Sequence, residues 1–280
     1  MPRCLLICMS LLLAACSSAV PSADDAPGPR IVSMSPALTD MVVELGGGRF
    51  IVGRSPFCRG VDADVPVVGD LLNVHWERLA RVNPTHILVQ SSPAMVNPAL
   101  TALAERRDWQ VMAHPLVGTD DIRSAMQVLP DQLALPPIDA GVARNRADGF
   151  EQMIEQILSQ GPVLDGDRVL IVSPMEPPLA WGTDTYLGQI LEGFGASNAL
   201  PIAGWSPIGF EDVVRCRTDR VLVVASYEPD PTHPLFIALD QLPEQVTVDT
   251  LVHPALNLPA TNLPAIMRTM RATLGAGVSK

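Results

Sequence analysis

The sequence predicts an α/β protein with two Rossmann-like lobes, each built on a parallel sheet, joined by a single long helix and enclosing a ligand cleft. Three observations predict this fold class. Short β-branched runs alternate with segments of helical period, the same order of features occurs twice, and an uninterrupted helical pattern separates the two copies. Alternating strands and helices are typical of parallel sheets with helical crossovers. A chain of 280 residues is long enough for two lobes that each bury a core.

The first copy opens with a β-branched run over residues 30–34 that ends at Ser35 and Pro36. Serine can cap a helix and proline suits its first turn, and apolar side chains at helical spacing follow. Three consecutive glycines then end this helix. The remaining elements expected in this half are a strand over 50–53, a loop through 67–70, a helix near 74–82 that carries Glu77, and a strand over 87–90.

The second copy repeats these features in the same order. A β-branched run over residues 168–172 ends at Ser173 and Pro174. Glu77 and Glu211 each stand ten residues before the first residue of the next expected strand. One shared feature could arise by chance, but the whole order indicates an internal repeat. The other elements expected here are a helix over 185–191 with a glycine stop at 193–195, a loop at 202–205, a helix that carries Glu211, and a strand over 221–224.

Between the copies lies a segment, residues 139–160, with helical periodicity and no internal proline. Prolines precede it and Gly-Pro follows it, so we expect one long helix whose rigidity limits movement between the lobes. Open α/β sheets bind ligands at the carboxyl ends of their strands, which places the cleft between the lobes. The predicted domains are an N-terminal lobe over 30–135, a connecting helix over 136–162 and a C-terminal lobe over 163–280, with a last helix near 263–274.

The N-terminus predicts export. An apolar run follows Arg3 and is too short to span a bilayer, which is typical of a signal peptide over residues 1–15. The run ends in Leu-Ala-Ala-Cys16, which resembles the bacterial lipobox, so we expect lipidation of Cys16 and membrane anchoring in the periplasm. Ordinary cleavage near Ala15 is the alternative. Residues 16–29 are rich in Pro, Ala, Ser and Asp and are predicted to form a disordered tether.

Composition and motifs argue against several other functions. A formal charge of −11 disfavours nucleic-acid binding. Once the export segment is set aside, Cys58 and Cys216 remain, and we expect both to be free because they fall in different predicted lobes. The histidines show no metal-ligand spacing, so no metal site or cofactor is expected. An α/β hydrolase is a remote alternative, because no G-x-S-x-G motif is present and the glycine pair near 193–195 follows a helix.

Three segments resemble a known family. Residues 30–46, 67–89 and 168–195 are similar to the iron-siderophore/cobalamin class of ABC-transporter substrate-binding proteins, and most closely to its cobalamin-binding members. The resemblance covers residues 30–274 and implies two α/β lobes joined by one backbone helix. It further implies a monomer that captures cobalamin or another corrinoid and delivers it to an ABC permease dimer with its ATPase. Ferric siderophore or haem binding by the same fold, and a surface scavenger without a permease, remain alternatives.

The resemblance also assigns roles to individual residues. Glu77 and Glu211 match the family's two docking glutamates, which bind arginine pockets on the permease; bidentate Arg–carboxylate pairs would fix the docking orientation. The alternative is that both are solvated helix residues. Leu179 falls where the family often has an aromatic beside the ligand, and Leu71 where a cobalamin binder can carry tryptophan. The predicted ligand-binding residues are Phe57, Leu71, Leu179, Trp181, Trp205 and His253.

Each predicted ligand residue has a competing interpretation. Any of the aromatic residues could instead pack in a core, although a broad, flat ligand favours aromatic walls with few polar contacts. His75 and His253 could coordinate cobalt or iron, and a hydrogen-bonded surface role is the alternative. Arg54, Arg59 and Tyr227 are side chains of the kinds that siderophore and haem binders place in the cleft, which keeps those ligands open.

Overall fold

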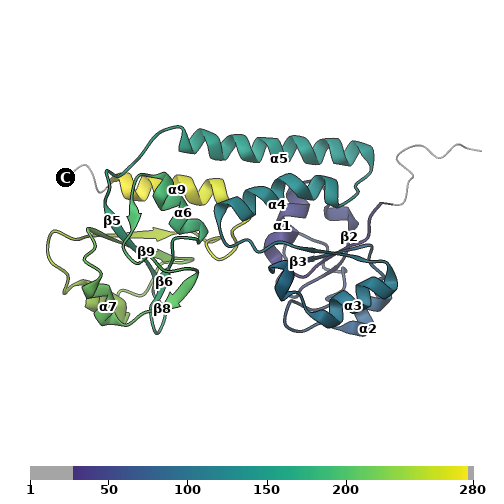
Figure 1. The fold of residues 1–280 in the computed structure, drawn as a ribbon, viewed down its shortest axis with the longest axis horizontal. Coiled ribbons are helices and arrows are strands. Elements are labelled where there is room, and N and C mark those ends of the chain that lie inside the picture. The colour runs from purple at the N-terminus through teal and green to yellow at the C-terminus, as the bar shows by residue number, and fades with distance from the viewer. Residues whose placement is uncertain (1–27, 277–280) are drawn as a thin grey trace, which may run out of the picture.

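The computed structural model describes residues 28–276. The predicted signal peptide, Cys16 and the tether up to residue 27 lie outside the described residues. Two α/β lobes stand side by side, and one long helix runs along the top of both (Figure 1). The two-lobe α/β fold predicted from the sequence is therefore confirmed.

The N-terminal lobe contains a four-stranded parallel sheet with strand order β2-β1-β3-β4. Ser35 caps the first helix, where its Oγ accepts a hydrogen bond from the Leu38 amide, and Pro36 is the first helical residue. The elements are β1 (Ile31–Ser33), α1 (Pro36–Glu44), η2 (Gly48–Phe50), β2 (Ile51–Arg54), α2 (Trp76–Val82), β3 (His86–Val89), η3 (Pro93–Met95), α3 (Pro98–Arg107), β4 (Gln110–Ala113) and α4 (Thr119–Gln132).

The C-terminal lobe contains a six-stranded sheet in which β10, β9, β5 and β7 are parallel. Its elements are β5 (Arg168–Ser173), β6 (Leu179–Trp181), α6 (Tyr186–Gly193), β7 (Ser197–Asn198), β8 (Trp205–Pro207), α7 (Phe210–Arg215), β9 (Arg220–Ala225), α8 (Pro234–Leu239), β10 (Thr247–Val252) and α9 (Leu263–Ala276). This sheet is mixed, not purely parallel as predicted, because β6 runs antiparallel to both β5 and β8.

A short connection explains the antiparallel strand. Only residues 174–178 separate the end of β5 from the start of β6. A parallel return would need a crossover of about a dozen residues or more, so the chain can only turn back on itself. As a result, β6 and β8 extend the C-terminal sheet beyond the elements that the N-terminal lobe contains.

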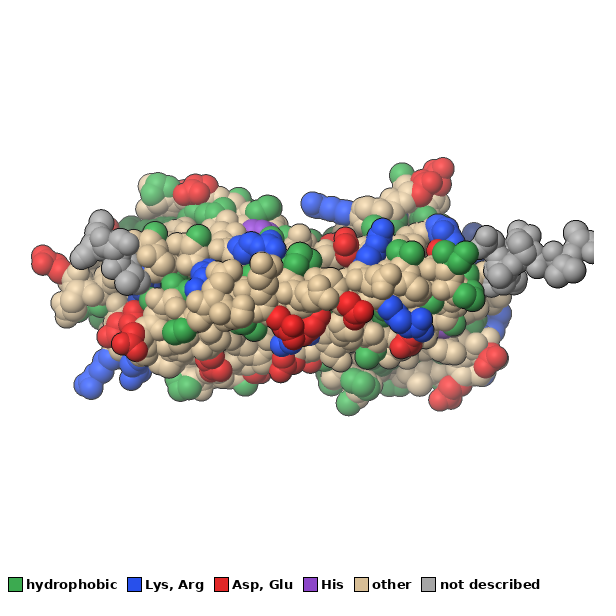
Figure 2. Space-filling model, turned by 90° about the horizontal axis from the view of Figure 1, so that it is seen from above, with side chains coloured by type: hydrophobic (Ala, Val, Ile, Leu, Met, Phe, Trp, Pro, Cys, Tyr) green, Lys and Arg blue, Asp and Glu red, His purple; other side chains and the backbone are tan. Residues whose placement is uncertain are grey.

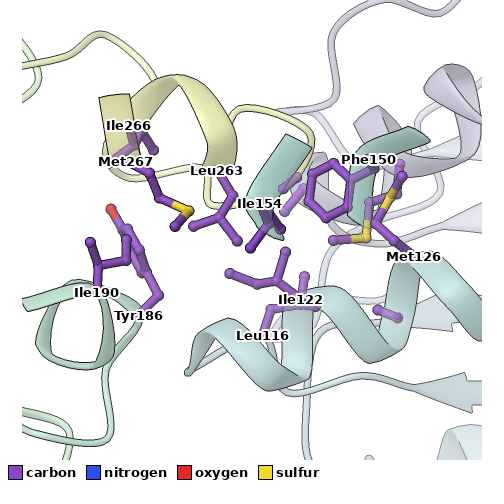
Figure 3. Packing of buried hydrophobic residues seen from close by; sticks show 14 of the residues in the cluster. Leu116, Ile122, Met126, Phe150, Ile154, Tyr186, Ile190, Leu263, Ile266 and Met267 are labelled. Atoms are coloured by element: carbon purple, nitrogen blue, oxygen red, sulfur yellow. The ribbon is translucent and has the colours of Figure 1, made fainter. Parts of the chain in front are cut away.

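The lobes are joined by α5 (Pro137–Leu158) and by direct packing beneath it. One continuous hydrophobic cluster includes buried residues of α4, α5, α6 and α9, and Figure 3 shows Ile122, Ile154, Tyr186 and Leu263 converging from these four helices. The Tyr186 amide also donates a hydrogen bond to the Val117 carbonyl across the junction, at 2.8 Å. A close-packed junction of this kind limits lobe movement more than a lone helix would.

The surface carries charges of both signs. Acidic and basic side chains are interspersed over the face seen from above (Figure 2). Within residues 28–276, no helix combines the length and apolar character needed to cross a membrane.

Candidate functional site

A pocket of about 310 Å³ lies between the two lobes. The N-terminal lobe contributes Gln90 and Leu116, and the C-terminal lobe contributes the remaining lining residues. The complete lining consists of Gln90, Leu116, Leu179, Trp181, Tyr186, Trp205, Leu256, Asn257 and Pro259. Three of the six predicted ligand residues, Leu179, Trp181 and Trp205, therefore come together here.

The two tryptophans of this inter-lobe pocket are positioned by the antiparallel strands. Trp181 and Trp205 are cross-strand partners on β6 and β8, and their rings meet edge to face with centroids 5.6 Å apart. Trp181 is 5% exposed and its Nε1 donates to the Ser173 Oγ at 2.8 Å, whereas Trp205 is 41% exposed. Trp181 thus supports the wall from behind, and Trp205 offers the accessible aromatic surface.

Polar groups on the pocket wall are largely held by the protein itself. Gln90 directly follows β3, and its Oε1 accepts a hydrogen bond from the Ser35 Oγ at 2.7 Å. The Tyr186 hydroxyl donates to the Leu256 carbonyl, and burial raises the pKa of Tyr186. Leu116 has a φ of 53°, in the left-handed region that side chains other than glycine seldom adopt. The wall is therefore mainly apolar, with few groups free to bind a ligand.

No charged residue appears among the nine lining residues just described. The two arginines considered from the sequence are placed elsewhere. The Arg54 guanidinium donates hydrogen bonds to the carbonyls of Val65 and Ser55, so backbone groups of the neighbouring loop already bind it. Arg59 is exposed and lies near Asp40. Burial raises the pKa of Asp40, and the positive charge of Arg59 opposes that rise. The inter-lobe pocket therefore suits a ligand without strong net charge where it contacts this wall.

The other three predicted ligand residues lie outside the inter-lobe pocket. Phe57 is 65% exposed on the loop after β2. Leu71 packs against the buried core of its own lobe, in a cluster that includes Leu79. His253 follows β10, its Nδ1 accepts a hydrogen bond from the Ala255 amide at 3.2 Å, and burial lowers its pKa. A ligand role for these three residues stays a prediction.

Sequence reasoning missed several lining residues. Gln90 could have been found, because it stands at the carboxyl end of a predicted strand, where α/β sheets bind ligands. Leu116 and Leu256 carry no such signal, since each reaches the pocket from an irregular segment. The place of Leu116 in the pocket depends on how the lobes pack together, because the other lobe supplies most of the lining.

The two predicted docking glutamates occupy matching places. Glu77 is exposed in the first turn of α2, and Glu211 is exposed in the first turn of α7. Both helices lie at the ends of their lobes on the side away from α5 (Figure 1). Glu211 also pairs with Arg215 at 2.8 Å within its own helix. Carboxylates at helix N-termini also stabilise the helix, because they interact with the positive end of its dipole.

Two observations on the described part of the chain concern possible metal ligands and thiols. Among residues 28–276 there is no group of three or more His, Cys, Asp and Glu side chains that could hold a metal ion. Cys58 is buried in the N-terminal lobe, Cys216 is partly buried in the C-terminal lobe, and both are free. Burial and nearby Asp212 raise the pKa of Cys216, which disfavours the reactive thiolate.

The family model described as "Periplasmic binding protein" matches residues 31–242. The chain therefore belongs to the periplasmic binding protein family. It is a substrate-binding component of a transport system and not an enzyme, and a protein of this kind works with a small-molecule ligand and an ABC permease. A search of the curated proteins found no sequence match.

Three solved structures from Vibrio cholerae are similar in fold. The periplasmic vitamin B12 binding protein has a TM-score of 0.71 and 16% identity, over 91% of this chain and 99% of that one. The periplasmic haem binding protein has a TM-score of 0.69 and 20% identity, over 88% and 98%. A siderophore binding protein bound to Fe3+-Desferal has a TM-score of 0.65 and 16% identity, over 89% and 99%. At these identities the likeness shows the fold alone.

Proposed function

We propose that this protein captures cobalamin or a related corrinoid and delivers it to an ABC importer. The observation that carries the proposal is the inter-lobe pocket, whose wall is aromatic and apolar and includes no cationic side chain. The periphery of a corrin ring bears neutral amides, whereas haem carries two carboxylates and many siderophores are anionic. An anionic ligand would need arginine or lysine at the wall, because a buried charge requires a partner.

One observation favours haem or a ferric siderophore as the second candidate. Tyr227 is 78% exposed on the loop after β9, so its phenol is free to approach a ferric ion. Similarity in fold extends to haem and siderophore binders as well as to the vitamin B12 binder. The uncharged wall is the reason that we place the corrinoid first.

A thermal-shift panel tests the ligand class directly. The purified protein is heated with cobalamin, cobinamide, haem or several ferric siderophores, each at saturating concentration. A ligand present at 100 times its dissociation constant adds about 2.7 kcal/mol of stability. We expect a clear rise in Tm with the corrinoids and quenching of Trp205 fluorescence. If Tm rises only with haem or only with a siderophore, that ligand takes the place of the corrinoid in the proposed function.

We further propose that Glu77 and Glu211 dock the two lobes onto the permease. Their support is one exposed carboxylate at the same helical position in each lobe, which fits a two-fold partner with arginine pockets. The double variant Glu77→Ala/Glu211→Ala should lose uptake in cells and keep its ligand affinity. The matched control changes two exposed glutamates on other helices, Glu155→Ala and Glu192→Ala. Uptake that survives in the first variant argues against docking.

The proposed place of action is the periplasm, with the protein held to the membrane by lipid on Cys16. The lipobox resemblance of residues 13–16 supports this proposal. Cys16→Ser should move the protein from the membrane fraction to the soluble periplasmic fraction, as followed by immunoblotting. A protein that fractionates identically with and without Cys16 was not anchored through it.

A further inference from the structure

An apolar groove of about 300 Å³ opens between α7 and α8, at the end of the C-terminal lobe that lies away from α5 (Figure 1). We call it the tip groove. Three large apolar side chains in its lining are exposed: Phe210 to 37%, Val214 to 46% and Ile237 to 57%. Pro234 and Ala238 add further apolar lining. Exposed apolar side chains gathered in one patch mark an interaction surface, whereas scattered single ones do not.

The helical spacing explains why these side chains share one groove and why the fold does not bury them. Phe210 and Val214 stand four residues apart on α7, so they lie on the same side of that helix. Ile237 follows Pro234 by three residues on α8 and shares a side with it in the same way. Other residues of the two helices supply the core of the lobe, namely Val213, Leu235 and Leu239. The apolar lining of the groove is therefore surplus to the lobe's own core.

Each lobe end presents an exposed aromatic ring directly beside an exposed carboxylate. Trp76 is the first residue of α2 and precedes Glu77, and Phe210 is the first residue of α7 and precedes Glu211. Trp76 is 39% exposed, close to the value for Phe210. Leu72, just before α2, is 86% exposed and adds apolar surface to the N-terminal lobe. The two ends therefore repeat a pair of groups, and not a carboxylate alone.

The chemistry of the pair favours a protein partner that carries arginine beside apolar side chains. Glu211 itself lines the tip groove, so an occupant has to bind a carboxylate as well as cover apolar surface. The planar guanidinium of arginine can pair with a carboxylate and stack on an aromatic ring. A lipid chain in the groove would leave the carboxylate without a partner. A symmetric contact with a second copy would bring two such carboxylates into one interface.

We infer that the permease binds the lobe ends through apolar contacts in addition to the glutamates. An apolar side chain of the permease enters the tip groove, and the arginines that pair with Glu77 and Glu211 lie against Trp76 and Phe210. This inference rests on the proposed docking function. Charge pairs govern the orientation and speed of encounter, whereas buried apolar side chains keep a complex together. The apolar contacts therefore determine how long the docked complex lasts.

Neutral polar substitutions in the tip groove test the inference without changing the charge beside Glu211. Val214→Gln/Ile237→Gln replaces two exposed apolar side chains and spares the core. Initial uptake of radiolabelled cyanocobalamin is measured in cells that carry this variant or the unmodified protein. We expect uptake at limiting cobalamin to fall by about tenfold, because the docked complex dissociates sooner. The dissociation constant for cyanocobalamin, measured by calorimetry, should stay within about twofold, which separates docking from capture.

Photocrosslinking locates the partner of the tip groove directly. Ile237→benzoylphenylalanine places a photoreactive group in the groove, and Met153→benzoylphenylalanine places the same group on an exposed position of α5. Irradiated cells should yield a crosslink from position 237 to a membrane-embedded permease subunit, identified by mass spectrometry. Position 153 should yield none. Crosslinking at both positions or at neither contradicts a specific groove contact.

The controls separate failure of the inference from failure of the proposed function. Ile138→Gln/Met153→Gln makes the matched change on α5, away from the lobe ends, and should leave uptake unaltered (Figure 1). Normal uptake in the groove variant overturns the inference and leaves docking by the glutamates standing. Absence of corrinoid uptake with the unmodified protein overturns the proposed ligand, and the crosslink from position 237 then decides the groove contact. If the double variant does not fold, Ile237→Gln alone decides.

Two further results would assign the tip groove to another occupant. The soluble variant Cys16→Ser is mixed with phosphatidylglycerol vesicles, and flotation that the groove substitutions abolish would show that lipid fills the groove. The same protein is examined by sedimentation velocity, and a dimer that the groove substitutions convert to a monomer would show that a second copy fills it. Either result overturns the permease contact.

Discussion

The two lobes share an order of elements but contribute unequally to the ligand site. The N-terminal sheet is wholly parallel and gives the inter-lobe pocket only Gln90 and Leu116. The C-terminal sheet has two further strands, and these supply Leu179, Trp181 and Trp205. An internal repeat therefore preserves a scaffold, while a short antiparallel insertion in one copy creates the aromatic wall. Equivalent position in the two copies does not imply an equivalent role.

The lobe ends show the same contrast on a smaller scale. Glu77 and Glu211 stand at matching positions, yet only Glu211 has an ion-pair partner within its own helix, Arg215. An exposed pair of this kind contributes about 0.3–0.5 kcal/mol. Docking of the C-terminal lobe would exchange that weak pair for a stronger bidentate one, a step that Glu77 does not need.

The largest expected effect separates the two tryptophans of the C-terminal wall. Trp181→Ala removes a buried ring and leaves the Ser173 hydroxyl without its partner, so we expect a loss of about 3–5 kcal/mol in the free energy of unfolding. Trp205→Ala removes a half-exposed ring and should cost about 1 kcal/mol. Urea unfolding followed by circular dichroism measures both. Equal losses would show that Trp205 also belongs to the core.

The next effect concerns affinity and compares the lobes directly. Trp205→Ala should weaken ligand binding by about tenfold or more, because aromatic anchors at the centre of a binding site dominate its energy. Phe57→Ala should weaken binding by about threefold or less, since Phe57 lies outside the inter-lobe pocket. Trp205→Phe is the control that retains an aromatic face. A larger loss at Phe57 would move the principal wall to the N-terminal lobe.

Much of the fold could be predicted from the sequence because its signals are local. The Ser-Pro pair that caps α1 and the glycines that end α1 and α6 act within one helical turn. Strand direction is different, because a β-branched run reads the same in parallel and antiparallel pairs. The direction of β6 could be inferred only from the five-residue connection before it, which is too short for a parallel crossover. That signal is a length and not a sequence motif.

Lining residues of the inter-lobe pocket could be predicted where they lie in one segment of the chain, but not where they come together through the packing of the two lobes. Leu179 and Trp181 lie in one short strand, and Trp205 is their neighbour through β8. Leu116 reaches the inter-lobe pocket only through the packing of the two lobes. Leu71 matches a ligand position of the family by sequence, but its side chain packs against the core of its own lobe.

The smallest expected effect is the pH dependence of stability. Burial lowers the pKa of His86 in β3, and the same cause acts on His114 in the N-terminal lobe and on His253 in the C-terminal lobe. The unfolded chain therefore binds more protons than the folded chain as the pH falls below about 6.5. The stabilising contribution of the buried, neutral histidines is complete above that pH and is lost as the pH falls through the lowered pKa of the folded state.

His86→Gln should make the free energy of unfolding fall less between pH 7.5 and 5. Denaturant titrations of the unmodified protein and of His86→Gln at several pH values give the comparison. Identical profiles for the two proteins would exclude His86 as a source of acid sensitivity.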